Sequence, residues 1–138
     1  MKAVSELLVG IEDLSTEKER VAFLQSIKPP HQKAVMMILK GMFDPTVKFR
    51  LPEGKPPYED SKDDNPGQLM AEIGRLYIFV EGGHPTVTDK RLQYLFQQIL
   101  STLIPSDADL LVAMKDKKSP YKGLNRQVVK KAFPGLIS

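Results

Sequence analysis

The sequence predicts an all-α fold: a compact bundle of about seven helices forming a single domain over residues 1–138, with one long proline-rich loop. Three observations lead to this prediction. Apolar residues recur at three- and four-residue spacing through most of the chain, which is the period of an amphipathic helix. Capping residues and prolines fall between these runs, where helices begin and end. Finally, 138 residues with 41% hydrophobic and 27% charged content are typical of one globular core.

The first three helices are delimited by local signals. Residues 5–13 carry the first apolar stripe. Thr16 and Glu19 have the spacing of a capping box, which starts a second helix that stops at Pro29. Pro30 suits the first turn of a third helix, because the missing N–H has no helical partner there. The inward positions of these helices are Leu7, Leu8, Ile11, Val21, Phe23, Leu24, Ile27, Val35, Ile38, Leu39 and Met42, and we expect Met36 and Met37 to fill the core as well.

Residues 44–67 interrupt the helical pattern. This stretch has five prolines in 24 residues and no sustained helical period. Residues 46–51 alternate polar and apolar side chains, which predicts a short extended segment pinned onto the domain. Residues 59–65 are acidic and polar, and we expect them to be mobile. A loop of this length is either functional or disordered.

Four more helices are predicted after the loop. Asn65 and Pro66 begin the fourth, which ends at Gly82. Thr88 begins the fifth, which Pro105 ends. The sixth is expected to start at a second capping box, Ser106 with Asp109, and the seventh at Asn125. Leu69, Ile73, Leu76, Tyr77 and Val80 face inward in the fourth helix, and the expected core includes Leu24, Ile38, Leu76, Leu95, Phe96, Ile99, Leu111 and Val129.

No motif predicts catalysis, a metal site or a cofactor. The chain has no cysteine, which excludes a disulfide, a thiolate nucleophile and a thiolate metal site. His31 and His84 are not at ligand spacing from each other, and the acidic residues 59–64 lack the spacing of a calcium loop. No glycine-rich phosphate loop precedes a helix. We therefore expect a protein that is not an enzyme.

No targeting or membrane signal is visible in the sequence. No apolar run approaches the roughly 20 residues that span a bilayer, and residues 1–10 do not have the pattern of a signal peptide. The expected location is the cytoplasm, which is that of an infected host cell if a phage encodes the protein, with the virion as an alternative. No membrane partner is expected.

Positive charge is concentrated near the C-terminal end. Seven basic residues and one acid between Lys115 and Lys131 give that segment +6, so the rest of the chain is −3 against a total of +3. A solvated lysine-rich face is one interpretation. The alternative is an anion-binding surface, since lysines in a turn, Tyr121 and the outward N–H groups of the next helix start suit a DNA phosphate. The predicted nucleic-acid-binding residues are Lys115, Lys117, Lys118, Tyr121, Lys122, Gly123, Asn125, Arg126 and Lys130.

The same region resembles a known family. Residues 107–116, a turn, and residues 123–137 are similar to the end of the N-terminal DNA-binding domain of ATP-dependent DNA ligases, especially those of tailed phages. The order of the first three helices is similar as well. The resemblance implies an all-helical domain that grips duplex DNA across the minor groove through the backbone, and it points to Lys115, Asp116, Gly123, Leu124 and Asn125, with a structural role for Phe133, Pro134 and Gly135. The Lys-x-Asp-Gly nucleotidyl-transfer motif is absent.

Two functions from different classes follow. The first is a non-catalytic accessory protein of a phage that binds the backbone of duplex DNA, independently of its sequence, in replication, repair or packaging. The second is a protein–protein adaptor or virion component that reuses the fold to bind a sliding clamp, a polymerase or a capsid partner through the basic turn or the long loop.

Overall fold

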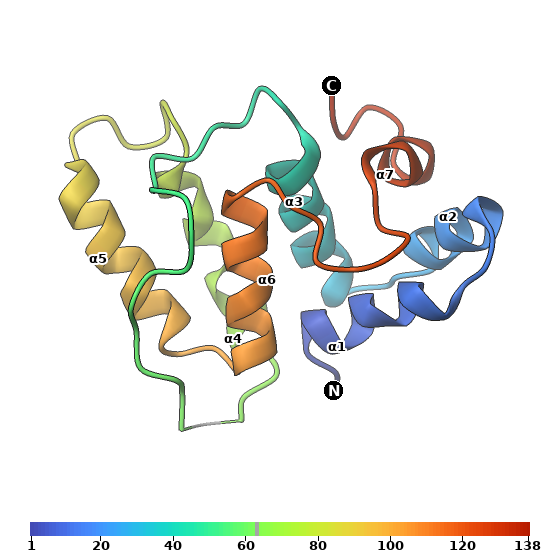
Figure 1. Ribbon diagram of the computed structural model, residues 1–138, viewed down its shortest axis with the longest axis horizontal. Helices are drawn as coiled ribbons and strands as arrows, with labels where there is room; N and C mark the ends of the chain where they lie inside the picture. Colours follow the sequence, from blue (N-terminus) through green and yellow to red (C-terminus); the bar gives the residue numbers. More distant parts are fainter. Residues whose placement is uncertain (63) are drawn as a thin grey trace.

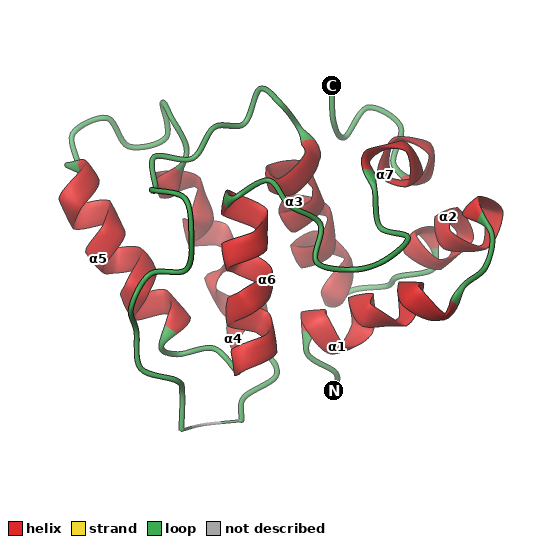
Figure 2. Cartoon of the chain, in the orientation of Figure 1, coloured by secondary structure: helices red, strands yellow, loops and turns green. Residues whose placement is uncertain are grey.

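The computed structural model describes residues 1–62 and 64–138, and Figures 1 and 2 show helices joined by loops in that part of the chain. It contains seven α-helices, which confirms the predicted class. They are α1 (Val4–Leu8), α2 (Glu17–Gln25), α3 (His31–Phe43), α4 (Gln68–Glu72), α5 (Asp89–Leu100), α6 (Pro105–Lys115) and α7 (Arg126–Ala132). Two 3₁₀ segments, η1 (Val9–Asp13) and η2 (Ile73–Phe79), directly continue α1 and α4. No helix in the described part is long and apolar enough to cross a membrane.

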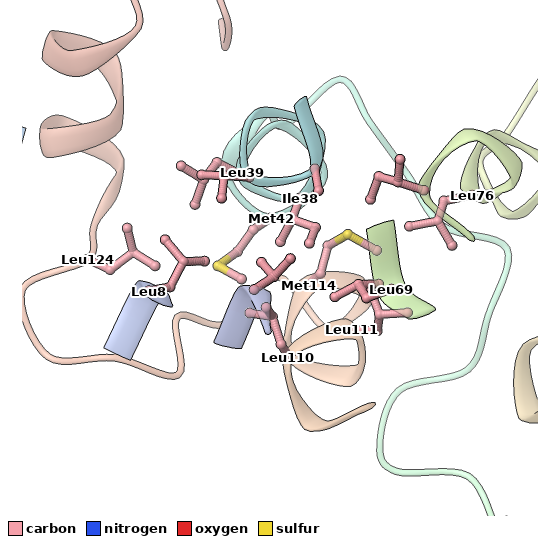
Figure 3. Close-up of a cluster of buried hydrophobic side chains, with 14 of the residues drawn as sticks. Leu8, Ile38, Leu39, Met42, Leu69, Leu76, Leu110, Leu111, Met114 and Leu124 are labelled. Atoms are coloured by element: carbon pink, nitrogen blue, oxygen red, sulfur yellow. The ribbon is translucent and has the colours of Figure 1, made fainter. Parts of the chain in front are cut away.

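The core forms where α3 and α6 pack against each other. Figure 3 shows Ile38 and Met42 of α3 facing Leu111 and Met114 of α6, with Leu8 of α1 beside them. On one side, α2 packs mainly against α7, and on the other, η2 packs against α5. Phe79 and Phe96 meet there edge to face, with ring centroids 5.3 Å apart. The helices therefore share one apolar core, as the sequence predicts.

Three of the predicted helix starts are confirmed by their side-chain caps. The hydroxyls of Thr16 and Thr88 accept backbone N–H groups at 3.2 Å, and the amide oxygen of Asn125 accepts another at 3.0 Å. The predicted capping box at Ser106 is wrong, because α6 already begins at Pro105 and Ile104 occupies the N-cap position without a side-chain hydrogen bond. Proline fits the first helical position, so Pro105 begins α6, and α5 has already ended at Leu100.

The predicted fourth helix changes type partway along. Only Gln68–Glu72 is α-helical, and the next seven residues form a 3₁₀ helix. A 3₁₀ helix has three residues per turn, so Ile73, Leu76 and Phe79 share one buried face. Tyr77, predicted to be buried, is instead 55% exposed. The 3.6-residue period used for the prediction therefore fails in this segment.

Several other side chains that the sequence places inward lie nearer the surface. Leu95 is only half-buried, because α5 turns Leu92, Phe96 and Leu100 inward and leaves Leu95 at the edge of that stripe. The methionines of α3 also divide: Met42 is buried, Met36 is half-buried and Met37 is 37% exposed. The prediction that all three methionines fill the core is wrong for Met37. Of the eight core residues that the sequence predicts, the seven other than Leu95 are buried.

The long loop contains the short extended piece that the sequence predicts. Phe49 forms an isolated antiparallel bridge with Val80. The Arg50 N–H donates to the Phe79 carbonyl, and the Glu81 N–H donates to the Lys48 carbonyl, each at 2.8 Å. Figure 1 shows the rest of the long loop running past α5 and α6. The predicted mobility of residues 59–65 falls partly on Asp63, which lies outside the described residues.

Candidate nucleic-acid interface

The nine residues predicted to contact nucleic acid lie on the end of α6, the turn after it, and α7. After α6 the chain crosses in front of α3 and then enters α7 (Figure 1). The segment does bring the predicted residues into one region. However, these residues divide into two groups. Those of the first group make contacts within the fold or shape the turn, and those of the second are exposed cations.

Lys115 belongs to the first group. Its side chain is 2% exposed, and its Nζ donates to the carbonyls of Pro52 and Gly54 at 3.0 and 2.7 Å. A third bond, at 2.6 Å, goes to Oδ1 of Asp116, whose carboxylate also accepts the Gly54 N–H. Lys115 therefore fastens the long loop to α6. An ammonium held in this way does not reach a DNA phosphate, so the structure corrects its predicted place on the binding surface.

Lys117 is an exposed residue, but its ammonium is also held by backbone carbonyls. Its Nζ donates to the carbonyls of Gly41 and Asp44 at 2.5 and 2.9 Å, and it lies 5.4 Å from the centre of the Phe49 ring. These carbonyls belong to the C-terminal end of α3, where a cation is favourable because unpaired carbonyls carry partial negative charge. Burial lowers the pKa of Lys117, and the nearby Asp44 carboxylate acts against that shift. Lys117 thus links the ends of α6 and α3, and its predicted role on the binding surface stays a prediction.

The Asp44 carboxylate has hydrogen bonds of its own beside this contact. It accepts the Thr46 N–H at 2.9 Å and the Thr46 hydroxyl at 2.8 Å, and these bonds lower its pKa. Lys40 lies 3.5 Å away and lowers the pKa of Asp44 further. The end of α3 therefore holds a small network of two lysines and one carboxylate.

Three of the predicted residues shape the turn. Gly123 has a φ of +87°, and a β-carbon there would come within 2.6 Å of Nε of Arg20. The Asn125 side chain is occupied in capping α7 through the Val128 N–H. Tyr121 is half-buried, and burial raises its pKa to about 12. These residues position the turn, and the N-cap contact of Asn125 takes up one of the N–H groups proposed for a phosphate.

The second group consists of exposed cations. Lys118 forms a solvent-exposed ion pair with Glu53, with 3.2 Å between Nζ and Oε1. Lys122, Arg126 and Lys130 have exposed side chains and no ion pair with any residue that the structure describes. Arg126 and Lys130 are four residues apart in α7 and so lie on the same side of that helix. We call Lys122, Arg126 and Lys130 the α7 basic face.

One signal in the sequence does single out Lys115. Lys115 follows Leu111 by four residues, which places it on the same stripe of α6 as Leu111 and Met114. A lysine on an apolar stripe has a buried stem and needs a polar partner for its ammonium. Lys117 offers no such signal, because it follows the helix and has a φ of +59°.

The described residues contain no group of three or more His, Cys, Asp or Glu side chains that could hold a metal ion. The two histidines have separate contacts. Nε2 of His31 lies 2.6 Å from the Lys2 carbonyl, and Nδ1 of His84 lies 3.3 Å from the Thr86 hydroxyl.

Together, the fold and this region define a small all-α protein with a cationic turn and last helix. Residues 7–120 match the model of DUF6433, a family of unknown function, and the match covers most of the chain. The chain therefore belongs to the DUF6433 family. No curated protein and no solved structure matches it. The α7 basic face follows the matched range.

Proposed function

We propose that this protein is a non-catalytic accessory protein that binds the phosphate backbone of duplex DNA through the α7 basic face. The observation that carries the proposal is that the side chains of Lys122, Arg126 and Lys130 are exposed and form no ion pair with any residue that the structure describes. The Glu12 carboxylate accepts the backbone N–H of Lys122 at 2.9 Å and leaves its ammonium unpaired. Such cations are free to neutralise phosphates and release the counterions condensed on DNA. The resemblance of residues 107–137 to the ligase DNA-binding domain supports the same partner, and it adds phage replication, repair or packaging as the setting.

The structure reduces the number of contacts that the sequence predicts. Lys115 is buried, and the ammonium of the exposed Lys117 is already held by two carbonyls, which leaves the three residues of the α7 basic face and Lys118. The ion pair of Lys118 with Glu53 is exposed on both sides, and such pairs contribute little, so a phosphate can replace the carboxylate. The expected number of phosphates contacted is therefore about three to four.

The test is a titration of a fluorescent duplex with the full chain at several salt concentrations, followed by anisotropy. With about three to four phosphates contacted, the log–log slope of affinity against salt should be about −3 to −4, and duplexes of unrelated sequence should bind alike. Changing Arg126 and Lys130 together to Glu should weaken binding to all duplexes and make the slope shallower by about 2.

A matched control separates this face from net charge. The double change Lys48→Glu, Lys90→Glu alters the net charge equally at two other exposed lysines, and it should retain most of the affinity. Equal losses in the two double variants would show that general charge, and not the α7 basic face, determines binding. Failure to bind duplex DNA at about 50 mM salt, with protein in the tens of micromolar, would exclude the proposed function.

A second candidate function is the protein–protein adaptor, in a replication complex or in a virion. It is favoured by a separate observation, which is the apolar surface that α3 and η2 leave exposed at Met37 and Tyr77. Exposed apolar side chains that line one hollow are typical of a site where another molecule binds.

A further inference from the structure

Two adjoining hollows open along α3. The first has a volume of about 380 Å³ and lies between α3, the extended piece and η2, with Met37, Phe49, Tyr77 and Met114 among its walls. The second, of about 580 Å³, lies between α3, the Pro29–Pro30 turn and the C-terminal segment. Met37 and Lys40 line both. The two hollows are therefore neighbours along α3, and together we call them the α3 groove.

The walls of the α3 groove suit the apolar side chains of a polypeptide. Met36, Met37 and Met114 line it, and methionine adapts its shape to different partners because its side chain is flexible and polarisable. Small-molecule sites usually place a few buried polar groups around the ligand to fix its orientation. In the described part of the α3 groove the charged side chains belong instead to exposed residues, Lys33, Lys40 and Glu81. An open groove of this kind is typical of helix-in-groove recognition.

The charges at the groove indicate which partner fits. The second hollow is lined by Lys33 and Lys40, with no acidic residue among its described lining. Lys33 has no ion pair in the described chain. Lys40 is half-exposed, 3.5 Å from the Asp44 carboxylate and 3.2 Å from the Leu136 carbonyl. A partner with carboxylates at this end would supply the negative charge that Lys33 lacks.

From this shape and charge we infer that the α3 groove binds an acidic amphipathic helix of another protein. Apolar side chains at helical spacing fill the two hollows, and an Asp or Glu lies against Lys33 and Lys40. None of the residues of the α7 basic face lines the groove. The inference therefore goes beyond the proposed DNA binding, and each can fail without the other; it deepens the second candidate function, the adaptor, by naming its partner.

A selection experiment with the full chain tests it. The immobilised protein is used to select from a display library of randomised helical peptides of about 16 residues. Enriched peptides should combine Leu, Ile, Phe or Met at three- and four-residue spacing with Asp or Glu at one end. The best peptide is then made synthetically, labelled, and titrated by fluorescence anisotropy. If no peptide family is enriched above the background of the starting library, the inference is wrong.

Substitutions in the groove show whether the peptide binds there. Met37→Glu should weaken the peptide at least about 10-fold, because it places a carboxylate in an apolar wall that both hollows share. Met37→Ala should weaken it less. Lys33→Glu should weaken it and reduce the salt dependence of binding. The matched controls are Tyr94→Glu and Lys90→Glu, at an exposed aromatic and an exposed lysine of α5, and both should bind as the unmodified chain does.

The methionines provide a direct readout of position. With ¹³C-methyl methionine, the signals of Met36, Met37 and Met114 should shift when the peptide is added, whereas that of the exposed Met1 should stay in place. A peptide that binds Met37→Glu as tightly as the unmodified chain, or that moves Met1 and leaves Met37 unchanged, would overturn the inference. Circular dichroism of each variant checks that the fold is kept.

Discussion

Replacing Lys115 by methionine should destabilise the protein strongly, although lysine is usually a surface residue. Methionine keeps most of the length of the side chain but removes the ammonium. The substitution therefore deletes three hydrogen bonds, to Pro52, Gly54 and Asp116, and leaves the Asp116 carboxylate without its cation. The Asp116 side chain is only 10% exposed, so water replaces the lost partner poorly.

The expected loss can be derived from these contacts. Breaking a buried ion pair by removing one partner costs about 3–5 kcal/mol. The lower end applies here, because Asp116 still accepts the Gly54 N–H and because Pro52 and Gly54 are themselves exposed, so water can reach their carbonyls. We therefore expect Lys115→Met to lower the free energy of unfolding by about 3 kcal/mol, a large part of the 5–15 kcal/mol typical of a domain.

Urea denaturation followed by circular dichroism at the helix minimum measures this loss, and Lys118→Met is the matched control. Lys118 is three residues away in the chain, but its ion pair with Glu53 is 69% and 75% exposed, so its loss should stay below about 1 kcal/mol. The double change Lys115→Met, Asp116→Leu should recover part of the stability, because the carboxylate left unpaired is then gone. The reasoning is refuted if Lys115→Met costs no more than Lys118→Met.

Two further predictions concern the turn after α6 and the first turn of that helix. Gly123→Ala should cost about 1–3 kcal/mol in urea denaturation, because Gly123 has a φ of +87° and the new β-carbon would meet Arg20. Gly54→Ala, with a φ of +97° but no described atom within 4 Å of the new β-carbon, should cost less, and equal losses would contradict a role for the Arg20 contact. Asp107 has a pKa raised mainly by burial, with the Ser5 hydrogen bonds acting against the shift. As the pH rises from 3.8 through the raised value, the unfolded chain loses this proton first, so stability should fall. Asp107→Asn removes that dependence, and its stability relative to the unmodified chain should improve across this pH window. Parallel stability curves for the two proteins would contradict the prediction.

The sequence by itself determines most of the helices, because the signals that start and shape a helix lie within one turn of each other. The cap at Thr88 and the apolar spacing of the following residues predict the start and the buried face of α5, and Asn125 does the same for the start of α7. These signals depend on the chain's own backbone N–H groups and on burial of one helical face. They hold almost regardless of which element packs against the helix.

Tertiary packing decides where these local patterns fail. The segment Ile73–Phe79 winds as a 3₁₀ helix, leads into the bridge with Phe49 and packs against α5, which turns Phe79 inward and leaves Tyr77 exposed. Nothing in its own residues distinguishes the two helical periods clearly enough to predict this change.

The candidate site also combines a feature that the sequence predicts with one that only the tertiary structure decides. The sequence predicts where the positive charge is concentrated, but only the structure decides which cations remain free to bind a partner. Lys115 and Lys117 are bound to backbone carbonyls that lie 61 to 76 residues away in the chain. Every residue has a carbonyl, so such a partner leaves no mark in the sequence. Lys122, Arg126 and Lys130 have the same kind of charge, but their side chains are exposed and form no ion pair with any described residue.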